Sequence, residues 1–139
     1  MFRKNRSGKI EPMPKKQLRK IQRAFQRQGG IIQMDKETDE YLRTKHAEGI
    51  TYDSKTILLR QNPGRASVFE ELIHTAQYRD GKNDGSRKSV LLNEIEAQNK
   101  LIRNAKAYKL TESEINQTRK ALRMYTDELE AYNVTHGGG

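Results

Sequence analysis

The sequence predicts an α+β domain in which several helices pack on a small sheet, preceded by a basic N-terminal arm. Three observations lead to this class. A chain of 139 residues suffices for one domain with a single modest core. Segments with helical spacing alternate with short β-branched segments, and glycine or proline separates many of them. Residues 1–28 contain ten Lys or Arg and one acid, whereas the remaining residues carry equal numbers of bases and acids.

The first half of the chain predicts two helices, one short strand and a hairpin. Pro14 suits the first turn of a helix that Gly29 and Gly30 end. A polar turn between two β-branched segments predicts the hairpin. The expected elements are a helix over 14–28, a strand over 31–34, a helix over 36–47 and a hairpin formed by 50–52 and 56–59.

The second half predicts three helices. One spans 65–79, the next contains residues 93–98, and the last starts at a capping box in which Thr111 and Glu114 bond reciprocally. Apolar residues then recur along one stripe of this last helix, which indicates packing. The expected organisation is a flexible basic arm over 1–13, a single domain over 14–133 and a frayed tail over 134–139.

The stretch from Val68 to Gln77 holds the clearest chemical pattern. In a helix with the motif H-E-x-x-H, two histidines one turn apart bind zinc and the glutamate between them activates water. Here Glu70 occupies the first ligand position, Glu71 the position of the base and His74 the second ligand position. Because a carboxylate can replace an imidazole at zinc, the stretch predicts a metal site with Glu70 and His74 stacked one turn apart.

A second carboxylate for this site is expected from the helix that contains residues 93–98. Glu94 falls within its apolar stripe, where a carboxylate is costly unless it is paired or binds a metal. Glu96 points to nearly the opposite side of the same helix. We expect only one of the two to reach a given metal ion, and both are candidates.

Taken as a pair, Glu71-Leu72-Ile73-His74 with Gln77 and the downstream Glu94-Ile95-Glu96-Ala97 resemble the minimal zincin metallopeptidase domains. They are similar in particular to the zincin-like metallopeptidase toxin domains at the C-termini of bacterial polymorphic toxins and of phage head-morphogenesis proteins. The resemblance covers roughly residues 30–130. It implies a zincin-like fold that cleaves a protein by metal-activated water. It also implies Glu71 as general base, His74 as ligand and Glu94 or Glu96 as downstream ligand, with Glu70 where the family has its first histidine.

The expected cofactor is one divalent metal ion. The chain has no cysteine and three histidines, His46, His74 and His136, so the site must be rich in carboxylates. Zinc is the first expectation, and manganese or iron is the alternative because harder oxygen ligands shift the preference toward them. Two carboxylates and one imidazole make the site less positive than two imidazoles and one carboxylate, so the pKa of a bound water is lowered less.

Two alternative functions stay open. With Glu70 in place of a histidine, the domain can be a catalytically inactive zincin-like fold. The basic arm instead favours a nuclease toxin or a nucleic-acid-binding module, because its cations would contact phosphates. The candidate contact residues are Lys15, Lys16, Arg19, Lys20 and Arg23.

The resemblance also implies partners and a source. We expect a protein substrate, a cognate immunity protein and nonspecific polyanion binding through residues 1–28. No apolar run reaches the roughly 20 residues of a membrane span, so the domain is expected to be soluble. We expect it to be encoded by bacteria or phages, and to be cytoplasmic or delivered as part of a larger exported protein.

Overall fold

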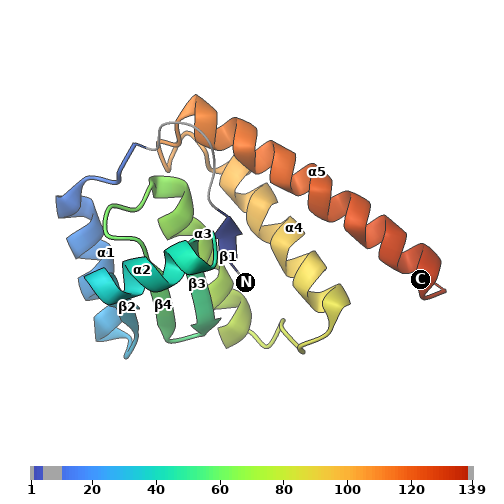
Figure 1. The fold of residues 1–139 in the computed structure, drawn as a ribbon, viewed down its shortest axis with the longest axis horizontal. Helices are drawn as coiled ribbons and strands as arrows, with labels where there is room; N and C mark the ends of the chain where they lie inside the picture. Colours follow the sequence, from blue (N-terminus) through green and yellow to red (C-terminus); the bar gives the residue numbers. More distant parts are fainter. Residues whose placement is uncertain (1, 5–10, 138–139) are drawn as a thin grey trace.

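The computed structural model describes residues 2–4 and 11–137 and confirms the predicted α+β class. Its helices and strands are shown in Figure 1, coloured along the sequence. In chain order they are β1 (Phe2–Lys4), α1 (Lys15–Arg27), β2 (Ile31–Gln33), α2 (Lys36–Thr44), β3 (Ala47–Asp53), β4 (Thr56–Leu59), α3 (Arg65–Arg79), α4 (Arg87–Arg103) and α5 (Glu112–Thr135).

The strands form one mixed sheet in the order β1-β3-β4-β2. β3 pairs antiparallel with β1 and with β4, whereas β2 pairs parallel with β4. The predicted hairpin is therefore present as β3 and β4. In β4 the side chains alternate between the faces, because Ile57 and Leu59 belong to one buried cluster and Leu58 to another.

Helices cover both faces of the sheet (Figure 1). α1 and α3 pack on the face that carries Ile57 and Leu59, and α2 packs on the face that carries Leu58. α4 packs against α3, and α5 runs along α4. As a result, α3 lies between the sheet and α4, and the protein surrounds it on nearly every side.

The boundary between α2 and β3 differs from the expectation. The helix was expected to reach residue 47 and the strand to begin at residue 50, but α2 ends at Thr44 and β3 begins at Ala47. His46 adopts a positive φ of 52°, which ends the helical path. The early residues of β3 then pair with β1, a strand that lies within the expected arm.

Parts of both expected ends belong to the fold. Within the arm expected over 1–13, residues 2–4 form β1, and Met13 is buried in the core with its amide donating to the Pro63 carbonyl at 2.8 Å. Residues 1 and 5–10 of this arm lie outside the described residues. At the other end, α5 includes residues 134 and 135 of the expected tail, and residues 138–139 are not described. The fold thus includes residues before residue 14, whereas residues 134 and 135 lengthen α5 but are exposed.

The start of α5 is also tied to the start of α3. The predicted capping box is present: Thr111 Oγ1 accepts from the Glu114 amide at 3.1 Å, and Glu114 Oε1 accepts from the Thr111 amide at 3.0 Å. Glu114 Oε2 accepts from the Ala66 amide at 2.8 Å, in the first turn of α3, whose N-cap residue Gly64 has no side chain. One carboxylate therefore caps two helices. Across residues 2–4 and 11–137, no helix combines the length and the apolar composition of a membrane span.

Candidate metal centre

The polar side of α3 is as deeply buried as its apolar side. Its apolar residues pack against the sheet and α4, as expected for the anchoring face. On the opposite side, Glu70, Glu71 and His74 are each at most 1% exposed. Buried ionisable groups are costly unless they are paired or bind a ligand, so this side of α3 requires a chemical explanation.

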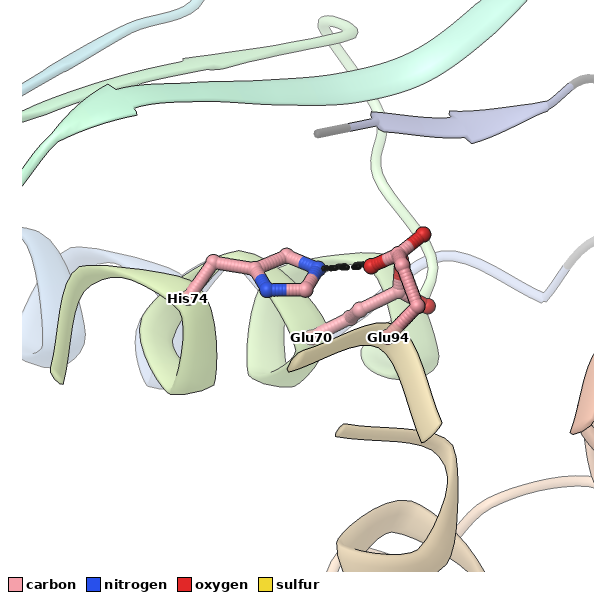
Figure 2. A group of neighbouring side chains, drawn as sticks. All are labelled: Glu70, His74 and Glu94. Carbon is pink, nitrogen blue, oxygen red and sulfur yellow. Dashed lines mark ion pairs between the residues drawn. The ribbon is translucent and has the colours of Figure 1, made fainter. Parts of the chain in front are cut away.

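Glu70 and His74 of α3 meet Glu94 of α4 in one group (Figure 2). His74 Nε2 is 2.7 Å from Glu94 Oε1 and 3.8 Å from Glu70 Oε2. Each residue offers one ligand atom, and these atoms all lie within 4.8 Å of one another. Ligand atoms on a tetrahedral zinc ion lie about 3.3 Å apart. Small side-chain adjustments would therefore let the group hold one divalent cation.

The protonation and bonding of this group also fit a cation. His74 Nε2 and Glu94 Oε1 are buried, and neither atom has a well-aligned hydrogen-bond partner among the described residues. Burial opposes protonation of His74, but Glu70 and Glu94 outweigh it and hold the pKa of His74 well above its ordinary value. A proton thus lies where two carboxylates converge, and a cation would compete with that proton for the same place.

Glu71 lies beside the group, and β3 holds it in place. Thr51 Oγ1 donates to Glu71 Oε1 at 2.8 Å, whereas Glu71 Oε2 is buried without a hydrogen-bond partner in the described part of the chain. A Cβ atom at Gly49 would lie 3.0 Å from Glu71 Cγ, so the glycine makes room for this side chain. Burial, followed by the charge of Glu70, raises the pKa of Glu71 to about 8.

Of the two downstream candidates, the structure brings Glu94 and not Glu96 to the group. Glu94 is 3% exposed and faces α3. Glu96 instead accepts from Gln77 Nε2 at 2.9 Å and from Lys82 Nζ at 3.0 Å. The apolar stripe of α4 therefore identified the buried glutamate, while the contact of Glu96 with Gln77 had no sequence signal.

Tyr125 of α5 is a further neighbour that the sequence did not single out. Its phenol is a neighbour of Glu94 and is affected by the charges of Glu94 and Glu70. Burial, together with these charges, raises the pKa of Tyr125, so the phenol stays protonated. Its position in the apolar stripe of the last helix indicated packing only. One indication of more was present in the sequence, namely that tyrosine places a hydroxyl oxygen within that apolar stripe.

The cations predicted to contact nucleic acid lie elsewhere. They are all on α1 and all exposed: Lys15, Lys16, Arg19, Lys20 and Arg23. α1 contacts β2 at one edge of the sheet, whereas α4 lies toward the opposite end of the molecule (Figure 1). The five cations therefore do not surround the group of Glu70, His74 and Glu94.

Comparison with known proteins adds one match. The model of a protein family described as metallopeptidase toxin 4 matches residues 5–128 of the chain. The matched range contains α3 and α4, and with them all four buried residues of the candidate centre. No curated protein matches the chain, and no solved structure does.

Proposed function

Because the chain belongs to the metallopeptidase toxin 4 family, we propose that it is a metal-dependent peptidase that uses this centre. In this proposal Glu70, His74 and Glu94 bind one divalent cation, and Glu71 is the general base. The observation that carries it is the convergence of three ligand atoms within 4.8 Å, beside a buried carboxylate on the same helix.

The donor set suits zinc, with manganese or iron as alternatives. One imidazole nitrogen and two carboxylate oxygens are ligands that zinc accepts, and the two oxygens raise the preference for the harder ions. A bound divalent cation would act as a Lewis acid that acidifies a water molecule and polarises a peptide carbonyl. Two ionised carboxylates and a neutral His74 would offset its double charge, which weakens this Lewis acidity relative to a site with two histidines.

Glu71 is suited to take the proton of the attacking water. Its Oε1 atom is fixed by Thr51, so its unpartnered Oε2 atom is the one available to a water molecule. A general base works best when its pKa lies near the operating pH, and burial already raises the pKa of Glu71 to about 8. Glu71 would then pass the proton to the leaving amine of the cleaved peptide bond.

The family description also supports a protein substrate. A cell that produces a protein-cleaving toxin must protect its own proteins, so we include a cognate immunity protein in the proposal. We further propose a bacterial or phage origin. Binding of polyanions by α1 is a separate property, because its five cations lie apart from the centre.

The test combines metal binding with catalysis. The protein is reconstituted with zinc or manganese, and its metal content is compared for wild type, His74→Ala and Glu71→Gln. We expect one ion per chain in wild type and in Glu71→Gln, and none in His74→Ala, because no second histidine belongs to the group. Glu71→Gln should lower protein cleavage, or toxicity on expression in bacteria, by about 10²–10⁴-fold while metal content and melting temperature stay near wild type.

A matched control replaces an exposed glutamate. Glu40 is exposed on α2, so Glu40→Gln should leave metal content and activity unchanged. Wild type without stoichiometric metal would contradict the proposed ligands. If Glu71→Gln is as toxic as wild type, Glu71 is not the general base of a peptidase, and the result favours the nuclease alternative. A wild type that binds metal but shows neither toxicity nor hydrolysis would identify an inactive zincin-like fold.

A further inference from the structure

Gln77 connects His74 to a charged residue on α4. Its side chain is buried and lies one turn after His74 on α3. Gln77 Oε1 is 2.8 Å from His74 Nδ1. Gln77 Nε2 donates to the main-chain carbonyl of Asn93 and to Glu96 Oε1, both at 2.9 Å. The amide of Gln77 thus has partners at both of its ends.

The chemistry of these partners fixes the orientation of the amide. A main-chain carbonyl and an ionised carboxylate can only accept hydrogen bonds. Asn93 and Glu96 contact the same end of Gln77, so that end is the NH₂ group and both of its hydrogens are used. The reversed amide would place its oxygen against two other acceptors.

Two lysines also contact Glu96. Lys82 Nζ is 3.0 Å from Glu96 Oε2, and Lys100 Nζ is 3.8 Å from Glu96 Oε1. A carboxylate that faces two ammonium groups accepts hydrogen bonds and has none to donate, so Glu96 is an acceptor for the Gln77 amide.

The tautomer of His74 follows from the orientation of Gln77. The free end of the amide is its oxygen, which can only accept, so His74 Nδ1 carries a hydrogen. Nε2 is the nitrogen that faces Glu70 and Glu94. Since a cation binds the lone pair of a neutral imidazole, the neutral form with its hydrogen on Nδ1 is the one that a metal ion between these residues needs.

We propose that Gln77, oriented by Glu96, is a positioning residue that keeps the hydrogen of His74 on Nδ1 and aims Nε2 at the cation. This inference rests on the proposed function, because it takes a cation to bind between Glu70 and Glu94. In this inference Glu96 orients the Gln77 amide and does not contact the metal ion. It also fixes the rotation of the imidazole ring, because the ring cannot turn without breaking its bond to Gln77.

The first test is the zinc affinity of Gln77→Met, measured by competition with a chromophoric chelator. Methionine is similar in size but lacks the amide, so His74 loses its acceptor. We expect zinc affinity to fall about 10-fold to 100-fold, as is usual when a hydrogen-bond partner of a ligand histidine is removed. Gln98→Met is the matched control, since Gln98 is equally buried but its Oε1 has no hydrogen-bond partner within the described residues. Its zinc affinity should match wild type.

The second readout is the tautomer itself. In zinc-loaded protein labelled with ¹⁵N, long-range proton–nitrogen correlation distinguishes the two ring nitrogens of His74. Wild type should show a hydrogen on Nδ1 that exchanges slowly with solvent, because Gln77 holds it in the interior. In Gln77→Met this hydrogen should exchange faster. A purely structural role for Gln77 would change the melting temperature but would leave the exchange rate and the zinc affinity of the folded protein unaltered.

A third variant decides the matter if Gln77→Met does not fold. Glu96→Gln keeps the shape of the side chain, but its amide can donate or accept, so the Asn93 carbonyl alone still opposes reversal of the Gln77 amide. We expect zinc affinity to fall about 3-fold to 10-fold, a smaller loss than for direct removal of the acceptor. Folded Gln77→Met or Glu96→Gln with wild-type affinity and wild-type exchange would overturn the inference. Failure of wild type to bind zinc or manganese would instead refute the metal centre, so the two failures are distinguishable.

Discussion

Replacement of Thr51 by valine tests how the fold holds the proposed base. The Thr51 hydroxyl lies 2.8 Å from Glu71 Oε1 and 3.1 Å from the Glu71 main-chain oxygen, and both residues are buried. Thr51→Val keeps the shape and the β-branching while it removes the donor. Because Glu71 Oε2 already lacks a partner among the described residues, the variant leaves both carboxylate oxygens unpaired.

The cost can be worked out from these contacts. A buried acceptor that loses its donor costs about 1–3 kcal/mol. Valine offsets a few tenths of this through its strand propensity and its buried methyl group, which leaves a net loss of about 1–2 kcal/mol. For a domain of this size the melting temperature should fall by about 3–8 °C. Protein cleavage should fall about 10-fold to 100-fold, because a shift of about 1 Å in a catalytic group has an effect of this size.

The assay is thermal unfolding of the metal-free protein, followed by zinc affinity and cleavage. Thr75→Val is the matched control, since Thr75 is also buried but its hydroxyl donates to the Leu72 carbonyl of its own helix, at 2.7 Å. Zinc affinity should stay near wild type in both variants. The reasoning is refuted if Thr51→Val is as stable and as active as Thr75→Val.

Three further predictions concern stability, pH dependence and the space around the base. Glu114→Ala should lower the free energy of unfolding by about 2 kcal/mol in urea titrations, because it removes the caps of two helices. Burial opposes ionisation of Asp39, but the Gln61 amide and two arginines outweigh it and lower the pKa of Asp39. Asp39→Asn should therefore cost about 1–2 kcal/mol at pH 7, and the difference from wild type should shrink as the pH falls through this lowered pKa. Gly49→Ala should displace Glu71 and lower cleavage about 10-fold, with zinc affinity retained.

Each of these predictions has a contrary outcome. Glu112→Ala removes an exposed acid from the same first turn of α5, so equal losses for both glutamate variants would show that the caps add nothing. For Asp39→Asn, a stability difference that is constant between pH 7 and pH 2 would contradict the pKa argument. For Gly49→Ala, unchanged cleavage would show that the alanine methyl group fits without moving Glu71.

The proximity of Glu70 to His74 could be predicted from the sequence because it depends on one helix. Glu70 and His74 are four residues apart, so any helix over this range stacks them. Glu94 was identifiable because a carboxylate within an apolar stripe faces a packed neighbour. The choice between Glu94 and Glu96 required the rotation of α4 about its axis relative to α3, which the packing of the two helices determines.

The sequence pattern could not predict contacts between segments that are distant along the chain. Thr51 lies 20 residues before Glu71 and donates to it from β3, and the alternation of that strand indicated only that some residue faces the helix. The expectation that β3 begins at residue 50 failed for a related reason. Its partner β1 lies within a basic segment that shows no apolar alternation, so only the sheet itself identifies it as a strand.

The double cap at Glu114 has a consequence for protein synthesis. A ribosome completes α3 and α4 before it adds Glu114, so the Ala66 amide has no carboxylate partner until the start of α5 has been made. The helix that carries Glu70, Glu71 and His74 is therefore fully capped only after α5 emerges and docks along α4. A nascent or truncated chain that stops before residue 112 contains all four residues of the centre without the support that holds their helix in place. The docking of α5 thus determines when the helix of the candidate centre gains its N-terminal cap.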